Sequence, residues 1–203
     1  MEGLVSIIIP CYNHINYVEE SILSVLGQSY SDIELIVIDD GSTDGSAELL
    51  ERLSREYKFR LYIQENCGLT ETLNKAIFGY AKGDFIQLLA SDDVLHEDKI
   101  SVQVSFLSTN PEFDFISGNY HEINSEGVVL KHWKRLDSEI SFEDIFVHGV
   151  QVTPVTLFYR RSFWRDLGKF KPGVINEDGW LLLNALNMGK RLYHLNIDTA
   201  LYR

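Results

Sequence analysis

The sequence has no long hydrophobic run and only two cysteines. Its first apolar stretch stops at Pro10, which is too short for a signal peptide or a membrane span. Cys11 and Cys67 show no CxxC spacing, and neither has an evident catalytic base beside it. These absences suggest a reducing compartment and give no support to nucleophilic catalysis by cysteine.

The sequence also lacks the glycine-rich motifs of common nucleotide-binding proteins. Neither GxGxxG nor GxxxxGK[ST] occurs, so a dinucleotide dehydrogenase or a P-loop NTPase is poorly supported. The six histidines show no metal-binding spacing. By default we assign surface or packing roles to His14, His96, His121, His132 and His194, and leave His148 unassigned.

Positive charge is scarce. The chain has 30 Asp and Glu against 18 Lys and Arg, and its net charge of −12 would repel a phosphate backbone, so nucleic acid is not expected as a partner. An acidic protein that handles phosphates would need a metal ion to offset this repulsion. The length of 203 residues and the hydrophobic share of 45% fit one soluble domain.

Apolar runs and helical patterns alternate in the first half of the chain. Strands are predicted at residues 5–9, 35–38, 59–64 and 84–90. Helices are predicted between them, with Asn16 and Asp44 as N-caps of the first two and Thr70 opening the third. This order predicts an α/β fold with a single, mainly parallel sheet flanked by helices, in which ligands bind beyond the carboxyl ends of the strands.

The pattern loosens after about residue 111. We expect a strand and a hairpin turning near Gly127, a short helix capped by Ser141, a strand at 153–159 and a helix over 178–188. We interpret residues 1–110 as a ligand-binding half and 111–203 as a smaller lobe on the same sheet. The final "TALYR" follows a strand-like run directly, which suggests a truncated C-terminus.

Three strand ends carry polar clusters: "PCYN", "DDGSTD" and "SDD". In "SDD", Asp92 and Asp93 repel each other unless a cation or hydrogen-bond donors intervene, and such oxygen ligands suit Mg²⁺ or Mn²⁺. The alternative is an N-cap, which is weakened because His96-Glu97-Asp98 offers a later cap for the next helix.

The other two clusters leave alternatives open. In "DDGSTDGS", Asp44 and Gly41 suit a helix cap and a turn, but that does not require both Asp39 and Asp40, one of which could accept hydrogen bonds from a base or ribose. In "PCYN", Tyr12 could stack on a nucleobase or simply pack.

A further acidic pair, Glu177 and Asp178 of "NEDGW", begins an apolar helix. The helix dipole favours their ionised form. They are either ordinary helix-start acids or functional carboxylates.

Together, "VSIIIPCYNHINYVEESILSVLGQSYSDIELIVIDDGSTDGS", "ENCGLTETLNKAIFGYAKGDFIQLLASDDVL" and "INEDGWLLLNALNMGKRLYHL" closely resemble the family 2 glycosyltransferases, which have the GT-A fold. The likeness extends over nearly the whole chain, is strongest up to about residue 107 and is looser from 111 to 170. It implies inverting transfer of a sugar from a nucleotide-sugar, typically a UDP-sugar, to an acceptor hydroxyl.

The resemblance also implies roles for individual residues. Matching motif positions assigns donor binding to Pro10, Tyr12, Asn13, Asp39, Asp40, Asn66, Gly68, Asn74 and Asp92. Asp40 matches the base-contacting position, Asp92 and Asp93 match the end of the metal-binding DXD motif for Mn²⁺ or Mg²⁺, and Asp178, or less favourably Glu177, matches the general base.

This chain departs from the family pattern at two positions. Ala90 stands where an Asp is frequent, which removes one carboxylate near the metal, and Leu73 stands where an Arg often precedes the Asn. A non-catalytic nucleotide-sugar-binding module of a larger glycan synthase is therefore the main alternative. A sugar-1-phosphate nucleotidyltransferase is a weaker one, because "PCYNH" is neither glycine-rich nor basic.

Family members often build surface polysaccharides or lipid-linked glycans at the cytoplasmic side of a membrane. We therefore expect a cytoplasmic protein with a glycan or lipid-linked acceptor and with peripheral contact to the inner membrane face as an option. The sequence does not specify the sugar, the linkage or the oligomeric state.

Overall fold

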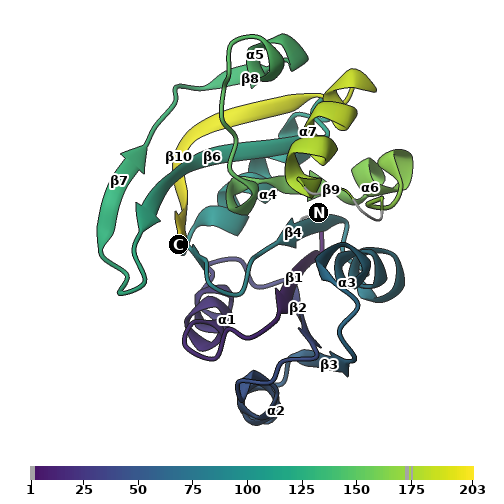
Figure 1. Cartoon of the computed structure of the whole chain (residues 1–203). Coiled ribbons are helices and arrows are strands. Elements are labelled where there is room, and N and C mark those ends of the chain that lie inside the picture. The colour runs from purple at the N-terminus through teal and green to yellow at the C-terminus, as the bar shows by residue number, and fades with distance from the viewer. Residues whose placement is uncertain (1–2, 172–173, 175) are drawn as a thin grey trace.

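The structure, a computed structural model, describes residues 3–171, 174 and 176–203. In this part of the chain the strands form one ten-stranded sheet in the order β3-β2-β1-β4-β9-β6-β10-β5, with β7 paired to β6 and β8 to β10 (Figure 1). The strands are β1 (Val5–Cys11), β2 (Ile33–Asp40), β3 (Arg60–Gln64), β4 (Phe85–Leu88), β5 (Val94–Leu95), β6 (Phe115–Ile123), β7 (Val129–Trp133), β8 (Ser138–Ile140), β9 (Phe158–Arg160) and β10 (Leu192–Tyr202).

The first half of the sheet is parallel. β1 pairs in parallel with β2 and β4, and β2 with β3, so their carboxyl ends lie at one edge. β9 runs antiparallel to both β4 and β6 and joins this half to the parallel pair β6 and β10. The predicted α/β class is confirmed. β2 is longer than predicted, and Asp39 and Asp40 are its last two residues.

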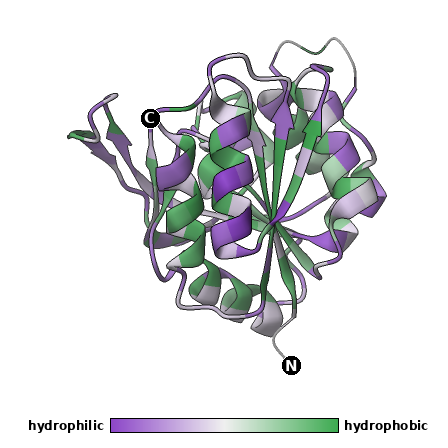
Figure 2. Cartoon of the chain, turned by 90° about the horizontal axis from the view of Figure 1, so that it is seen from below, coloured by the Kyte–Doolittle hydropathy of each residue, from purple (hydrophilic) through white to green (hydrophobic). Residues whose placement is uncertain are grey.

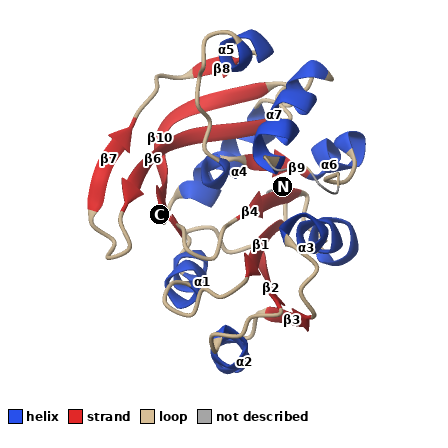
Figure 3. Ribbon diagram, viewed as in Figure 1, coloured by secondary structure: helices blue, strands red, loops and turns tan. Residues whose placement is uncertain are grey.

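Helices cover both faces of the sheet (Figure 3). The helices α1 (Val18–Leu26), α2 (Ser46–Tyr57) and α4 (Lys99–Thr109) pack on one face. The other face is covered by α3 (Leu69–Lys75) with its π-helical extension η1 (Ala76–Tyr80), α6 (Arg161–Leu167) and α7 (Glu177–Asn187). A short helix, α5 (Phe142–Phe146), lies beside α7.

Burial on both faces explains why β1 is mostly apolar. Ile7 and Ile9 belong to the core under α1, α2 and α4, whereas Ile8 belongs to the core under α3, α6 and α7. In Figure 2 the central strands are mostly green, and purple is more frequent on the surrounding helices and loops. When the side chains of a strand alternate between two apolar layers, the sequence of that strand is a nearly continuous hydrophobic run.

Two predicted N-caps differ from the structure. The N-cap of α1 is Tyr17 rather than Asn16, and no side chain caps that helix. The N-cap of α2 is Gly45, with φ of 95°, rather than Asp44. The Asp44 carboxylate still accepts the Ser46 N–H at 2.9 Å, although Asp44 lies one residue before the N-cap.

The second half matches the sequence predictions unevenly. The hairpin of β6 and β7 turns with Gly127 at φ of 80°, and Ser141 caps α5 in a capping box with Asp144, both as predicted. The strand predicted at 153–159 was wrong in its first half, where residues 154–156 form the 3-10 turn η2 (Pro154–Thr156). Pro154 has no N–H to donate to a neighbouring strand. None of the helices in the described residues is long and apolar enough to span a membrane.

Candidate active site

Two adjoining cavities lie beyond the carboxyl ends of β1, β2 and β4. The larger, about 410 Å³, is lined mainly by the segments that follow β1, β3 and β4, together with Asp40 at the end of β2. The smaller, about 270 Å³, is lined by residues after β4, by Asp178 of α7 and by the end of β10. Pro10, Leu69 and Ala90 line both, so the two cavities adjoin, and together they are called the cleft. The cleft lies at the sheet edge where the sequence predicted ligand binding.

Asp40 lies at the wall of the larger cavity and organises the loop after β3. Its Oδ1 accepts hydrogen bonds from Gln64 Nε2 at 2.7 Å and from the Cys67 N–H at 2.9 Å, and its Oδ2 accepts the Gly68 N–H at 2.9 Å. Burial alone would raise the pKa of Asp40, but these hydrogen bonds outweigh it and lower the pKa below its ordinary value. Asp40 is therefore an ionised acceptor, and Oδ2 has a lone pair left for a ligand.

Asp39 has a different environment from its neighbour. Its Oδ2 accepts the Ser42 N–H at 3.0 Å, which stabilises the turn after β2. The residue is 1% exposed, its Oδ1 has no partner among the described residues, and it does not line either cavity. The structure thus brings Asp40, but not Asp39, to the cleft.

The loop after β1 joins the loop after β2. Pro10 and Tyr12 line the larger cavity, and Tyr12 is 49% exposed, so its ring is available for stacking. Asn13 adopts a φ of 56°, and its Oδ1 accepts the Thr43 N–H at 2.8 Å. Asn13 therefore cross-links the two loops and is not among the residues that line the cleft.

The loop after β3 closes the larger cavity from the other side. Asn66 and Gly68 both line it, and Asn66 Nδ2 donates to the Asp40 carbonyl oxygen at 2.9 Å. Gly41 allows this approach, because a Cβ there would lie 2.8 Å from the Asn66 nitrogen and its φ is 76°. A residue with a side chain at position 41 would push this loop away from β2.

Asn74 lies on α3, away from both cavity linings. Its side-chain amide forms two hydrogen bonds with the main chain of Phe170, at 3.0 Å and 2.9 Å. Asn74 is 4% exposed, so its amide holds the main chain at Phe170 and is not directed at the cleft.

The acids after β4 line the smaller cavity and are held by the end of β10. Asp93 is 2% exposed, and its Oδ1 accepts the main-chain N–H of Arg203 at 2.9 Å. The Arg203 guanidinium binds main-chain oxygens, including that of Asp92 at 2.8 Å. Burial, together with the charge of Asp92, raises the pKa of Asp93 to about 7. The hydrogen bond from the Arg203 main chain lowers this pKa, but by less than burial raises it.

This pair of acids fits a divalent cation that prefers oxygen ligands. Asp92 and Asp93 both line the smaller cavity, where a cation would offset the burial of one carboxylate and the repulsion between the two. Ala90 is also in the lining and supplies no ligand. The site therefore offers two carboxylates rather than three.

Asp178 faces the same cavity from the first turn of α7. The helix begins at an N-cap, Asn176, whose Oδ1 accepts the Gly179 N–H at 3.0 Å. Burial, and then the charge of Glu177, raises the pKa of Asp178 to about 6. A carboxylate with this pKa is ionised at neutral pH but more basic than an exposed one, which suits a general base. Glu177 is not among the residues that line the cavity.

Several residues of the cleft are not marked by any pattern in the sequence. His14 was assigned to surface or packing, but it lines the larger cavity, and its Nδ1 lies 2.8 Å from Ser91 Oγ. Tyr202 and Arg203 line the smaller cavity. No local pattern marks them, because Arg203 meets Asp93 across 110 residues of chain.

The sequence also matches a known protein family. The sequence model of the family described as "Glycosyl transferase family 2" matches residues 6–167. An uncharacterised glycosyltransferase of Haemophilus influenzae is 39% identical over 190 residues, which cover 93% of this chain and 74% of that protein. The putative teichuronic acid biosynthesis glycosyltransferase TuaG of Bacillus subtilis is 33% identical over 205 residues, covering 98% and 79%.

Some relatives are much longer. An uncharacterised glycosyltransferase of Rickettsia conorii is 35% identical over 153 residues, which cover 75% of this chain. The matched region spans about a quarter of that relative, 24% of its length.

Solved structures share the fold at low sequence identity. Staphylococcus aureus TarS superposes with a TM-score of 0.81 at 21% identity, covering 98% of this chain and 36% of TarS. TarS 1–349 in complex with UDP-GlcNAc superposes with a TM-score of 0.78 at 23% sequence identity, covering 98% of this chain and 58% of that one. The mannosyltransferase PcManGT of Pyrobaculum calidifontis, in complex with GDP-Man and Mn²⁺, superposes with a TM-score of 0.75 at 20% sequence identity. The match covers 98% of this chain and 56% of PcManGT. The chain therefore belongs to family 2 of the glycosyltransferases and has the GT-A fold of that family.

Proposed function

We propose that this protein transfers a sugar from a UDP-sugar to an acceptor hydroxyl with inversion at the anomeric carbon. The observation that carries the proposal is the shared cavity of Asp92, Asp93 and Asp178, which adjoins the cavity lined by Asp40 and Tyr12. One cleft thus offers a place for a nucleoside, a pair of cation ligands and a carboxylate of raised pKa.

The larger cavity would bind the nucleoside. The free lone pair of Asp40 would accept a hydrogen bond from the N–H of uracil, while the exposed Tyr12 ring would stack against a base. Pro10, Asn66 and Gly68 would line the base and ribose. Structural relatives were solved with UDP, with UDP-GlcNAc and with GDP-Man, and a nucleoside diphosphate is common to all three ligands.

The smaller cavity would hold the diphosphate and the sugar. Asp92 and Asp93 would hold Mn²⁺ or Mg²⁺, which when bound supplies positive charge against the leaving diphosphate. Without such charge the two acids would repel a diphosphate, so donor binding should depend on the metal.

Asp178 would act as the general base. Its carboxylate would take the proton of the acceptor hydroxyl as the hydroxyl oxygen attacks the anomeric carbon, while the bond from that carbon to the diphosphate oxygen breaks. A single displacement of this kind inverts the anomeric centre and requires no covalent nucleophile. Glu177 would influence the reaction only through its charge on Asp178.

The acceptor would enter from the half formed by residues 111–203, opposite the donor-binding half of residues 1–110. A third cavity, of about 290 Å³, lies in the former half and is lined by residues that include Tyr120, Trp133, Lys134 and Arg135. Aromatic faces and hydrogen-bonding groups suit a glycan. Synthesis of a cell-surface polysaccharide or glycoconjugate in the cytoplasm, at the inner membrane face, fits the named relative in teichuronic acid biosynthesis.

The experiment that tests this proposal is calorimetric titration of the protein with UDP, with and without Mn²⁺. We expect binding that requires the metal and that Asp92→Asn/Asp93→Asn abolishes. Asp178→Asn serves as the matched control, because it removes an acid from the same cavity and should leave UDP binding intact. Binding of GDP or dTDP instead of UDP would overturn the uracil assignment.

A second experiment distinguishes an active enzyme from a non-catalytic nucleotide-sugar-binding module. The absence of a carboxylate at Ala90 is the reason for considering the second possibility. The donor that binds is incubated with the protein and Mn²⁺, and release of the nucleoside diphosphate is measured. Release that Asp178→Asn abolishes supports the enzyme. Binding without any release, over a panel of candidate acceptors, would favour the non-catalytic module.

A further inference from the structure

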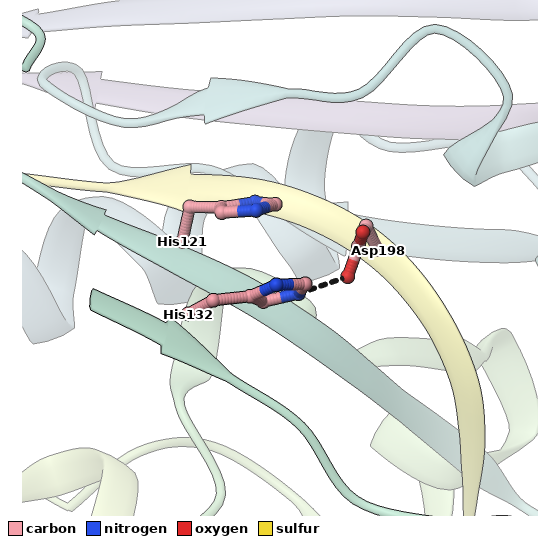
Figure 4. Close-up of side chains that lie close together, drawn as sticks. All are labelled: His121, His132 and Asp198. Atoms are coloured by element: carbon pink, nitrogen blue, oxygen red, sulfur yellow. Dashed lines mark hydrogen bonds and ion pairs between the residues drawn. The ribbon is translucent and has the colours of Figure 1, made fainter. Parts of the chain in front are cut away.

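Three potential metal ligands converge where β6, β7 and β10 lie side by side (Figure 4). They are His121 on β6, His132 on β7 and Asp198 on β10. One ligand atom of each lies within 4.8 Å of those of the other two. His132 Nε2 already lies 2.6 Å from Asp198 Oδ1, and the two imidazole rings stack with centroids 3.8 Å apart.

The topology of the sheet brings these side chains together. His121 and His132 are direct partners in the antiparallel pairing of β6 and β7, so both point to the same face. The register between β10 and β6 shifts on both sides of Asp198. Such irregularities redirect a side chain out of the regular alternation, and here the carboxylate is turned toward the two imidazoles.

Neighbouring nitrogen atoms are left without hydrogen bonds. Within the described part of the chain, His121 Nδ1 and His96 Nε2 are buried and have no partner. The His96 ring lies 5.6 Å from that of His121. Two neighbouring imidazoles therefore each have a buried nitrogen without a hydrogen-bond partner, and a bound cation would relieve this condition at His121.

We propose that His121, His132 and Asp198 bind a divalent transition-metal ion, with Zn²⁺ the best match, at a site separate from Asp92 and Asp93. Two imidazoles and one carboxylate are a donor set that suits Zn²⁺, whereas the all-oxygen pair in the cleft suits Mn²⁺ or Mg²⁺. The imidazoles are partly buried and Asp198 is exposed, so an ion can enter from solvent and a water molecule can complete the coordination. A moderate rotation of the stacked rings would direct both nitrogens at one ion.

The ion would tie the edge of the lobe together. In the described residues β7 pairs with β6 alone, so the outer hairpin strand has no strand on its other side. A metal shared by β7 and β10 would fix that strand through His132 and Asp198. Trp133, next to His132, lines the cavity of about 290 Å³, so the ion would also fix one wall of the acceptor-side cavity.

The test uses the full chain, freed of metal by chelator, and titrates it with Zn²⁺ by calorimetry and with Co²⁺ by visible absorption. We expect one ion per chain and the d–d absorption of a site with nitrogen ligands. His121→Ala/His132→Ala should abolish both signals, and Asp198→Asn should weaken binding about tenfold or more. His148→Ala is the matched control, because it removes an exposed histidine elsewhere and should bind as the wild type does.

Two further variants keep the result interpretable. His132→Gln preserves the shape of the edge if the double alanine variant does not fold, and it too should lose the Co²⁺ absorption. Asp92→Asn/Asp93→Asn should retain it. The proposal is overturned if the wild type binds neither ion, if the double histidine variant binds as well as the wild type, or if removing Asp92 and Asp93 abolishes the signal.

Discussion

Replacement of Asp178 by Asn should stabilise the fold while abolishing transfer. The structure buries this carboxyl in the cleft beside Glu177 and raises its pKa from 3.8 to about 6. Asn has nearly the same shape but no charge. The substitution therefore removes the cost of burying a charge and, on the proposed function, also removes the general base.

The size of the effect follows from linkage. A difference of about two pH units between the folded and unfolded pKa corresponds to about 3 kcal/mol, at about 1.4 kcal/mol per unit. Because the pKa is raised in the folded state, the protonated form favours folding. The destabilisation by Asp178 is thus fully present above about pH 6 and is lost as the pH falls toward 3.8. From pH 8 to pH 5 the wild type should regain about 1.4 kcal/mol from this group.

The measurement is urea denaturation of wild type and Asp178→Asn at pH 8 and pH 5, without metal or donor. The difference in unfolding free energy should favour the variant by up to about 3 kcal/mol at pH 8 and by about half of that at pH 5. Other titrating groups, such as Asp93, act in both proteins and cancel in the difference. Transfer by the wild type should rise with pH through about 6, and the variant should lose about 10²-fold to 10⁴-fold in rate.

Glu177→Gln is the matched control, because it removes the neighbouring acid that does not line the cavity. It should keep activity and move the acid limb of the pH profile to lower pH, since the charge of Glu177 contributes to raising the pKa of Asp178. The reasoning fails if Asp178→Asn is less stable than the wild type at pH 8 or if Glu177→Gln loses activity while Asp178→Asn keeps it.

Three further predictions concern the residues that support the cleft and, at the other end of the sheet, the contact between β9 and α4. Arg203→Ala should weaken Mn²⁺-dependent UDP binding about tenfold in calorimetry, because the guanidinium no longer holds the Asp92 main chain; unchanged affinity would contradict this. Gly41→Ala should lower the unfolding free energy, measured by urea denaturation, by about 1–3 kcal/mol and should reduce UDP affinity, because the new Cβ would meet the Asn66 nitrogen. A variant as stable as the wild type would refute this steric argument. Arg160→Met should lower the unfolding free energy by about 2–4 kcal/mol, because the Arg160 guanidinium donates to three carbonyls around the end of α4. An equal loss of stability on replacing an exposed arginine would contradict this prediction.

Much of the fold and part of the cleft could be predicted from local sequence. Apolar runs interrupted by turn residues indicated β1, β2 and β4, because a strand buried on both faces is mostly apolar. The alternating pattern of residues 59–64 indicated β3. Polar clusters directly after such strands indicated Asp40, Asp92 and Asp93, since parallel strands end at one edge. Asp178 was also predicted, and the structure places it in the same cavity as Asp92 and Asp93.

The sequence by itself thus determined the order of elements, the strand ends that carry the acids and the family. Tertiary structure decided which side chains meet. Arg203 reaches Asp93 only through the pairing of β10 with β6 and β5, and Asn74 turns out to bind the main chain of Phe170 rather than face the cleft. The grouping of His121, His132 and Asp198 depends on an interstrand register and an irregularity in β10. Periodicity reports which positions are buried, but register, loop closure and bulges depend on contacts between distant segments, and no local pattern encodes them.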